Sequence, residues 1–242
     1  MKQLFVILLF SISANIYADE LLFNTANTLY TNGDYTEAIS KYDSILSNNI
    51  TSYEIYYNIG NCYYKIGDLA NAIWHYEKSL KIHKNEKTIQ NLALVNSKII
   101  DRIEPLPQLF YKKWFQSISQ LFNTKLWQIL TLVCIWLFLL IIIFDSFTTY
   151  KKTRLSHFLL LTAILFLYIT NFSYTNTIEK EECIIFSSTV IVNSAPTSNS
   201  TDLFSLHTGI KVEIIDEIGD WINIKLINGN TGWIKKNNCK VL

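Results

Sequence analysis

The chain has 242 residues, of which 50% are hydrophobic, and its formal net charge is +1. The length allows one or two domains, and the balanced charge gives no indication of a nucleic-acid partner. The hydrophobic residues concentrate at the N-terminus and between residues 127 and 174. We therefore expect a membrane part beside soluble parts of ordinary composition.

The first 18 residues have the layout of a secretory signal. Lys2 provides a positive end, Leu4 to Phe10 form an apolar core, and small residues lead to Ala18. Cleavage after Ala18 leaves Asp19 as the mature N-terminus, and an uncleaved anchor is the alternative. In both cases the segment predicts that the residues after it are exported.

A repeat with a period of 34 residues follows the signal. The stretch "NTANTLYTNGDYTEAISKYDSIL" aligns with "NIGNCYYKIGDLANAIWHYEKSL". Identical residues occupy nine positions: Asn24/Asn58, Asn27/Asn61, Tyr30/Tyr64, Gly33/Gly67, Asp34/Asp68, Ala38/Ala72, Ile39/Ile73, Tyr42/Tyr76 and Leu46/Leu80. Each Gly-Asp pair predicts the end of one helix and the start of the next, because Gly favours the left-handed C′ position and Asp favours the N-cap.

The repeated spacing also places small Ala38 and Ala72 where two helices cross, with bulky Tyr42 and Tyr76 one turn later. The pattern resembles the tetratricopeptide repeat, whose period is 34. The second copy carries the family's signature positions: Tyr56, Ile59, Gly60, Tyr63, Gly67, Ala72 and Tyr76. The resemblance implies an all-α solenoid over residues 19–104, made of two repeats and a capping helix.

The two copies depart from the family at four positions. Thr25 and Ala26 stand where a large residue and Gly are usual, and Ile50 and Lys84 replace the closing Pro. The run "NEKTIQNLALVNSKIIDRI" supplies the capping helix, because its apolar residues recur at helical spacing. The prolines of "EPLPQL" then end the domain.

The first helix of each pair lines the concave face of such a stack. Each first helix carries two asparagines three residues apart, and therefore on one face: Asn24 and Asn27 in the first repeat, Asn58 and Asn61 in the second. An Asn amide both donates to and accepts from a peptide backbone. Resemblance to peptide-binding members implies that these four contact a partner; alternatively, they are solvated or structural. Phe23 and Tyr57 replace the basic residues of the carboxylate-clamp subfamily, so we do not expect a chain-terminal carboxylate as ligand.

Two apolar runs predict a transmembrane helical hairpin. Residues 127–144 and 158–174 carry no charge, and each run is close to the minimum length for a bilayer. A buried hairpin in a soluble protein is the alternative. The segment before the first run, residues 105–126, mixes Trp, Phe and Lys, which suits a linker that lies at the membrane interface.

The link between the runs, residues 145–157, contains Lys151, Lys152 and Arg154, which favours a cytoplasmic loop. Lysines before the first run carry the same signal on the opposite side, so the export signal decides the orientation. We expect a multi-pass protein of the inner membrane, in contact with the lipid bilayer, with both soluble domains on the periplasmic side.

After a linker, residues 175–182, short strands with regular turn signals predict a small all-β barrel over residues 183–242. Every second residue of "INIKL" is apolar, as in a strand with one buried face. Asn228-Gly229 predicts a two-residue type I′ turn. Gly232, within a strand, predicts a bulge or a close approach.

The motifs "VIVNSAP", "LHTGIKVEI", "GDWINI" and "GNTGWI" resemble those of the bacterial SH3 domain. In the early loop, which borders the family's ligand groove, Asn193 and Ala195 replace the usual Arg and Gly. Trp221 and Trp233 have two interpretations. They either contact a peptide or glycan, or they are structural residues at the barrel end or over the hairpin.

Cys183 and Cys239 lie near the two ends of the SH3-like module, whose terminal strands tend to be neighbours. In an oxidising compartment they are a candidate disulfide. The four histidines have no metal-ligand spacing, and the chain has no nucleophile elbow or phosphate loop. We therefore expect no catalytic residues, no metal and no cofactor.

The complete order of signal, repeats, two spans and SH3-like module resembles the BatE-like proteins of the aerotolerance (Bat) operon. This resemblance implies a protein that works beside other Bat proteins, some of which carry von Willebrand A domains. We expect a non-enzymatic, membrane-anchored scaffold whose two soluble modules bind such partners. The competing hypothesis is a cell-wall sensor that binds peptidoglycan peptides through its SH3-like module.

Overall fold

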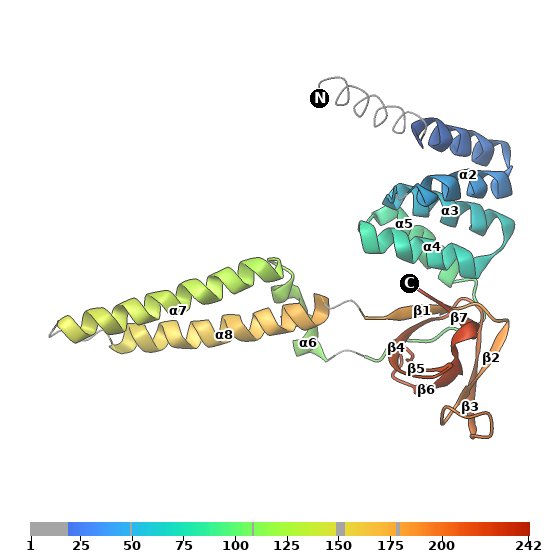
Figure 1. Ribbon diagram of the computed structural model, residues 1–242. Coiled ribbons are helices and arrows are strands. Elements are labelled where there is room, and N and C mark those ends of the chain that lie inside the picture. The colour runs from blue at the N-terminus through green and yellow to red at the C-terminus, as the bar shows by residue number, and fades with distance from the viewer. Residues whose placement is uncertain (1–18, 49, 108, 149–152, 178–179) are drawn as a thin grey trace, which may run out of the picture. The chain divides into compact units, whose positions relative to one another are not determined.

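A computed structural model describes residues 19–48, 50–107, 109–148, 153–177 and 180–242. The predicted signal segment and two loop lysines, Lys151 and Lys152, lie outside these residues. The chain divides into two units (Figure 1). The repeat–barrel unit combines Met1–Pro105 with Glu181–Leu242, and the hairpin unit is Leu106–Lys180.

The predicted helical repeats are present in the repeat–barrel unit. The helices are residues 19–32, α2 (Tyr35–Ser47), α3 (Tyr53–Ile66), α4 (Leu69–Ile82) and α5 (Glu86–Asn96). Gly33 and Gly67 have φ of 92° and 87°, as a left-handed helix end requires. The side chain of Asp68 accepts from the backbone N–H of Asn71, whereas Asp34 forms no such cap. The predicted glycine role is confirmed at both junctions, and the aspartate side-chain cap is present at the second.

The repeat spacing brings small and large residues together where the helices cross. Ala38 and Ala72 are fully buried, and Tyr42 and Tyr76 are almost fully buried. A Cβ on Gly60 would lie 2.7 Å from the Tyr76 ring, which is too close for any side chain. The absence of a side chain at Gly60 of α3 therefore leaves the space that the Tyr76 ring of α4 occupies.

The C-terminal part folds as the predicted all-β module. Within residues 180–242, the strands are β1 (Glu182–Ile185), β2 (Thr189–Asn193), β3 (Asp202–His207), β4 (Lys211–Ile218), β5 (Trp221–Lys225), β6 (Thr231–Lys235) and β7 (Cys239–Val241). They pair antiparallel in the order β3-β2-β6-β5-β4-β1-β7. Ile222 and Ile224 face the core, as their alternation predicted. A Cβ on Gly232 would lie 2.4 Å from Val192 Cγ1, so the predicted close approach is confirmed.

The predicted two-residue turn at Asn228-Gly229 is wrong. The Leu226 carbonyl accepts from the N–H of Gly229, and the Leu226 N–H donates to Asn230 O, both at 2.9 Å. The loop is therefore one residue longer, and Gly229, with φ of 88°, takes the left-handed position that follows the turn. The two-residue connection lies instead at Gly219-Asp220, between the paired ends of β4 and β5.

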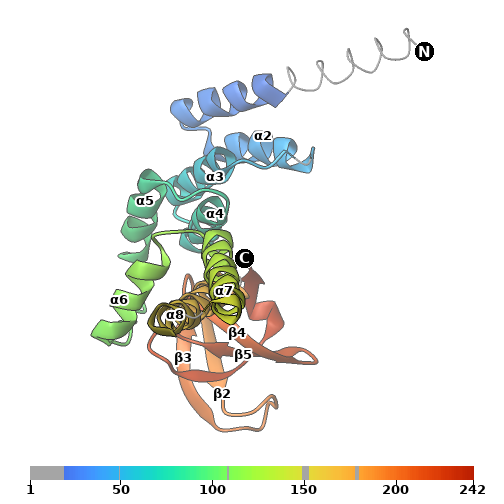
Figure 2. The same cartoon turned by 90° about the vertical axis from the view of Figure 1, so that its left-hand side faces the viewer.

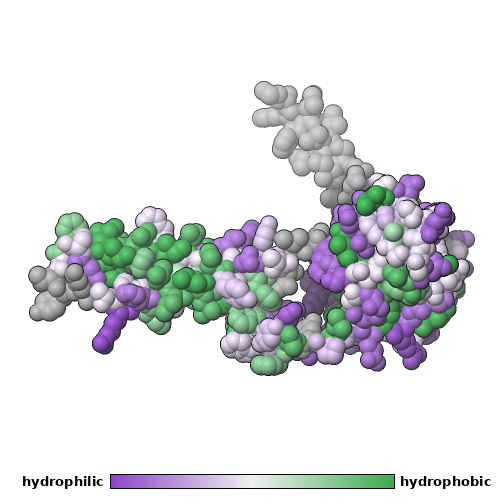
Figure 3. Space-filling view, turned by 90° about the horizontal axis from the view of Figure 1, so that it is seen from below, coloured by the Kyte–Doolittle hydropathy of each residue, from purple (hydrophilic) through white to green (hydrophobic). Residues whose placement is uncertain are grey.

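The hairpin unit contains α6 (Phe110–Ser119), α7 (Thr124–Phe147) and α8 (Thr153–Thr177). The two long helices pack side by side (Figure 2), where Thr131 Oγ1 and Thr170 Oγ1 lie 3.4 Å apart. Hydrophobic residues cover the outside of this hairpin (Figure 3). Both helices are long and apolar enough to cross a membrane, with mean hydropathies of 2.7 and 1.8. They extend beyond the predicted runs at both ends.

Within the repeat–barrel unit, the barrel packs on the second repeat. Ile184 of β1 joins the core cluster that contains Tyr76 and Val95. In the other direction, Ile99 and Ile103, from the segment after α5, pack against the barrel core. The two modules therefore exchange apolar side chains, and we call this contact the joint.

Polar contacts surround the apolar centre of the joint. Trp74 Nε1 donates to the Val241 carbonyl over 2.9 Å, and Lys240 Nζ lies 3.7 Å from the centroid of the Trp74 ring. Lys211 Nζ forms an ion pair with Glu77 over 2.9 Å. These bonds join β4 and β7 of the barrel to α4 of the repeats.

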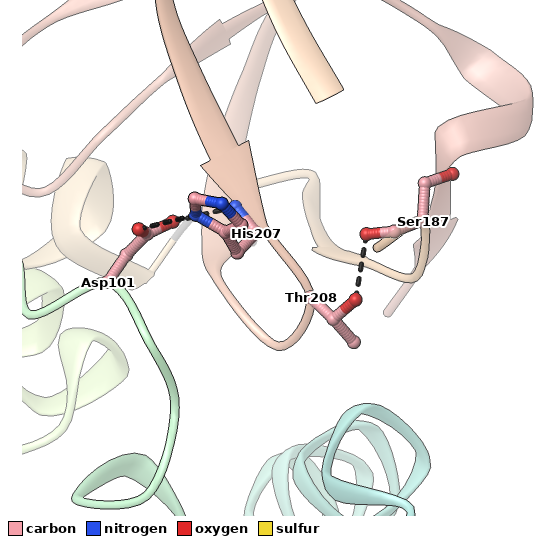
Figure 4. A network of polar contacts seen from close by, with 4 residues as sticks. All are labelled: Asp101, Ser187, His207 and Thr208. Carbon is pink, nitrogen blue, oxygen red and sulfur yellow. Dashed lines mark hydrogen bonds and ion pairs between the residues drawn. The ribbon is translucent and has the colours of Figure 1, made fainter. Parts of the chain in front are cut away.

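A second group of hydrogen bonds fixes the end of β3. The backbone N–H of His207 donates to Asp101 Oδ2 over 2.7 Å, and His207 Nδ1 lies 2.8 Å from Asp101 Oδ1 (Figure 4). Next to it, the Thr208 hydroxyl donates to the Ser187 carbonyl over 2.8 Å (Figure 4). Asp101 lies in the segment that follows the repeats, and it therefore binds both the backbone and the side chain of His207 in the barrel.

A test of the joint follows from two glycines that both have positive φ. Gly209 has φ of 95°, and an added Cβ would lie 2.8 Å from Ile99 across the joint; Gly219 has φ of 58°, and an added Cβ would meet nothing. Both alanine variants carry backbone strain, but only Gly209→Ala also disturbs packing, by about 1–3 kcal/mol. We expect Gly209→Ala to lower the thermal unfolding temperature more than Gly219→Ala does. Equal losses would contradict the joint.

His75 of α4 is a buried base without a hydrogen-bond partner for Nδ1 among the described residues. It is 6% exposed and stacks on Tyr63 with 5.2 Å between ring centroids. Burial, with the positive charges of Lys240 and Lys78, lowers the pKa of His75 from 6.5 to about 3. The folded protein therefore holds a neutral imidazole.

This lowered pKa predicts a dependence of stability on pH. In the unfolded chain His75 gains a proton below pH 6.5, whereas in the folded chain it does so only near pH 3. The contribution is therefore complete above pH 6.5 and is lost as pH falls, by about 1.4 kcal/mol per pH unit. We expect His75→Gln to reduce the dependence of the unfolding free energy on pH between pH 6.5 and 4.5, as measured by denaturant titration at each pH. An unchanged slope would refute this assignment.

Candidate functional site

The four predicted contact asparagines lie on the first helix of each repeat, and two of them, Asn27 and Asn61, accept hydrogen bonds from tyrosines of the second helix. In the first repeat, Tyr42 Oη donates to Asn27 Oδ1 over 2.6 Å. Asn58 Nδ2, from the next repeat, donates to the same oxygen over 3.2 Å. Asn24 lies outside this network and is exposed.

The second repeat builds the same arrangement. Tyr76 Oη donates to Asn61 Oδ1 over 2.7 Å, and Asn91 Nδ2, from α5, donates to that oxygen over 2.9 Å. Asn91 also donates to Tyr57 Oη. We call these repeated bonds the asparagine ladder. Each rung joins three helices, so the ladder is partly structural.

The tyrosine hydroxyls are suited to be donors in the ladder. Burial, followed by the neighbouring Cys62, raises the pKa of Tyr42 to about 12, and burial likewise raises the pKa of Tyr76. Both hydroxyls therefore stay protonated, and the carbonyl oxygens of Asn27 and Asn61 stay occupied. Among the described residues, the amide nitrogens of Asn27 and Asn61 have no hydrogen-bond partner, since the bonds to these side chains involve only their oxygens.

Sequence reasoning identified Asn27 and Asn61 but missed the tyrosines and Asn91 as members of the ladder. The signal for the tyrosines was present, because both Asn–Tyr pairs are 15 residues apart and both recur in the repeat. Asn91 had no such signal. It lies 30 residues after Asn61, whereas Asn58, which has the same role in the first rung, lies 31 residues after Asn27; the position that the repeat would predict is Leu92.

The two predicted barrel tryptophans lie on one face of neighbouring strands. Trp233 of β6 is paired with Asn223 of β5 and with Asn193 of β2, and Trp221 is paired with Lys235. Residues directly opposite each other point to the same side of a sheet, which here is the side away from the buried isoleucines. Both tryptophans are half-buried.

Two side-chain oxygens beside Trp233 stand out. Asn193 Oδ1 and Asn223 Oδ1 are buried and have no partner within the described residues. Asn193 as a whole is 8% exposed, and its Nδ2 donates to the Thr197 carbonyl over 3.4 Å. Two buried acceptors without a partner among the described residues therefore lie next to the Trp233 ring.

Cys183 and Cys239 lie on β1 and β7, which are neighbouring strands, in a diagonal arrangement. Both are free thiols in this structure. A hydrogen bond between the two thiols, together with burial, raises the pKa of Cys183, and the same bond lowers the pKa of Cys239. The two cysteines lie on neighbouring strands as free thiols, and the disulfide between them stays a prediction.

Comparison with known proteins identifies two segments of the chain. Residues 53–86 match the family model of the tetratricopeptide repeat, and residues 188–238 match that of the bacterial SH3 domain. No curated protein matches the chain. Both matched families are modules of protein interaction, and these segments support a protein-interaction role for the chain.

Solved structures match about a third of the chain. The TPR2AB-domain:pHSP90 complex of yeast Sti1 is 29% identical, with a TM-score of 0.31; the match covers 33% of this chain and 34% of that one. The N-terminal domain of stress-induced protein-1 (STI-1) from C. elegans is 14% identical, with a TM-score of 0.29, over 32% and 66%. The chain thus spans less than two thirds of both.

Oxidation provides a test of the cysteine pair. We expect mild oxidation of the full chain to join Cys183 and Cys239 and to stabilise the barrel by up to about 4 kcal/mol, because the bond closes a long loop. Peptide mass spectrometry without reductant detects the link, and Cys183→Ser abolishes it. Cys62→Ser is the control and leaves the link intact. A link that joins Cys62 or Cys134 instead would contradict the pairing.

Proposed function

We propose that this chain is a non-enzymatic scaffold of the cell envelope, anchored in the inner membrane by α7 and α8, that binds partner proteins through the repeats. The asparagine ladder carries this proposal. Because Tyr42 and Tyr76 occupy the ladder's carbonyl oxygens, the amides of Asn27 and Asn61 are left as hydrogen-bond donors on a face built from first helices. A row of fixed donors suits the carbonyl oxygens of an extended peptide.

The ligand segment is internal rather than the end of a chain. A terminal carboxylate needs a cation, and the positions that hold one in clamp-type repeats are occupied here by Phe23 and Tyr57. Their rings pack instead on the ladder tyrosines, with centroid separations of 5.8 Å to Tyr42 and 6.0 Å to Tyr76. The site thus gains apolar walls and lacks a charge for the carboxylate.

The partners in this proposal are membrane proteins of the Bat group, including those with von Willebrand A domains. The order of modules supports this assignment, since it resembles that of BatE-like proteins. The export signal and the basic loop support a periplasmic location for both soluble modules. An anchor confines scaffold and partner to one membrane, which raises their effective concentration.

One observation favours the sensor as a second candidate. The unpartnered oxygens of Asn193 and Asn223 flank Trp233, and an aromatic ring between two acceptors suits a ligand with N–H groups, such as a peptidoglycan peptide. A pelleting assay with purified cell wall separates the candidates. Retention of the full chain that is lost in Trp233→Ala favours the sensor.

The scaffold is tested by crosslinking in intact cells, followed by mass spectrometry. We expect the double variant Asn27→Asp, Asn61→Asp to lose crosslinks to its membrane partners, since each lost amide contact weakens binding by about 0.5–1.5 kcal/mol. Aspartate keeps an oxygen that accepts from Tyr42 or Tyr76 and removes only the amide donor. Asn199→Asp, at an exposed asparagine on the β2–β3 loop, is the matched control and keeps them. Unchanged crosslinks in the double variant, at an unchanged unfolding temperature, would contradict the proposed binding site on the repeats.

A further inference from the structure

The helix α6 has an apolar edge that no described residue covers. Phe110 is 84% exposed and Trp114 is 62% exposed, and they lie one turn apart on the same side of the helix. Tyr111 adds a third exposed ring next to them. Lys112 points to the opposite side, since it is two residues from both Phe110 and Trp114. Lys113 is three residues from Phe110 and therefore flanks the rings on their own side of the helix.

Contacts with the long helices hold α6 in place. The Phe115 ring lies 5.5 Å from that of Tyr168 and 6.2 Å from that of Phe172, both on α8. At the end of α6, Trp127 Nε1 of α7 donates to the Ser119 carbonyl over 3.1 Å. As a result α6 runs across the hairpin axis rather than along it (Figure 2).

The level at which α6 crosses the hairpin is where the apolar surface ends. Asn123 caps α7 by accepting from the N–H of Leu126, and Thr124 Oγ1 lies 2.8 Å from Ser173 Oγ on α8. A cavity of about 320 Å³ opens there, lined mainly by polar side chains such as Gln116 and Gln120. Polar side chains gathered at this level of the hairpin indicate a boundary between hydrocarbon and solvent.

We infer that α6 is an interfacial helix that inserts Phe110 and Trp114 into the headgroup region of the same phospholipid bilayer that α7 and α8 span. The inference rests on the proposed spanning of the membrane by these helices. Trp is enriched at this depth because it combines an apolar body with a polar N–H group, and Phe is common on the apolar face of interfacial helices. Lys112 and Lys113 then extend to the lipid phosphates.

A lipid surface fits this edge better than a protein does. The exposed rings continue, through the contacts of Phe115 with α8, the hydrophobic surface that covers the hairpin. The bilayer alone therefore covers both the exposed rings of α6 and the hydrophobic surface of the hairpin, and no second partner is needed. The flanking lysines provide the charge that a phosphate surface attracts.

Photocrosslinking tests this inference in the full chain, reconstituted in phospholipid vesicles without other proteins. Benzoylphenylalanine replaces one residue at a time: Trp114 or Phe110 on the exposed edge, Lys112 on the opposite face, and Leu139 on the outside of α7, which is 41% exposed. We expect lipid adducts at Trp114, Phe110 and Leu139, and a several-fold lower yield at Lys112. The aromatic replacement is conservative at Trp114 and Phe110, so folding is preserved.

The outcomes distinguish this inference from the proposed anchor. Lipid adducts at Leu139 without lipid adducts at Trp114 and Phe110 would leave the anchor intact and overturn the interfacial helix. Adducts to a second copy of the chain at Trp114 would overturn it in favour of self-association. Absence of lipid adducts at Leu139 would overturn the spanning hairpin and, with it, the inference.

Discussion

The repeat–barrel unit depends on the burial of one helix face. A solenoid of two repeats has an open end, because each repeat covers its neighbour and the last one needs a cap. Here α5 covers part of that end, and β1 adds Ile184 to the same core cluster as Val95 and Tyr76. The barrel thus takes the place of a further repeat. Without this contact α4 would expose its apolar face to water, and neither module would keep its position.

The joint also determines how the two proposed interaction surfaces are placed relative to each other. Two modules on a flexible tether search independently, whereas modules that share a core present their surfaces at a fixed separation. The polar contacts of Trp74, Lys211 and Asp101 define the orientation, because they are directional and apolar packing is not. A partner that contacts both the asparagine ladder and the Trp233 face must therefore match one fixed geometry. Rigidity of this kind favours specificity over reach.

The sequence was informative where a contact repeats. The period of 34 located the helices, the glycine ends and the buried tyrosines, since each occurs twice with the same spacing. It failed where structure depends on long-range packing: His207 and Asp101 are 106 residues apart, and no local pattern links them. The turn at Asn228 was wrong because Asn-Gly also suits the longer loop, in which only Gly229 needs positive φ. Asn193 was noted as a departure from the family, but its buried position beside Trp233 required the structure.

The chain leaves the repeat–barrel unit at Pro105 and returns to it at Glu181. One folded body cannot lie on both sides of a bilayer, so the intervening segment must cross the proposed membrane an even number of times. This parity is independent of the export signal and of the lysines in the loop. A single-span anchor, whichever way it is oriented, would pull the barrel and the repeats into different compartments and destroy the core that they share. The fold of the repeat–barrel unit therefore constrains the topology of the proposed anchor.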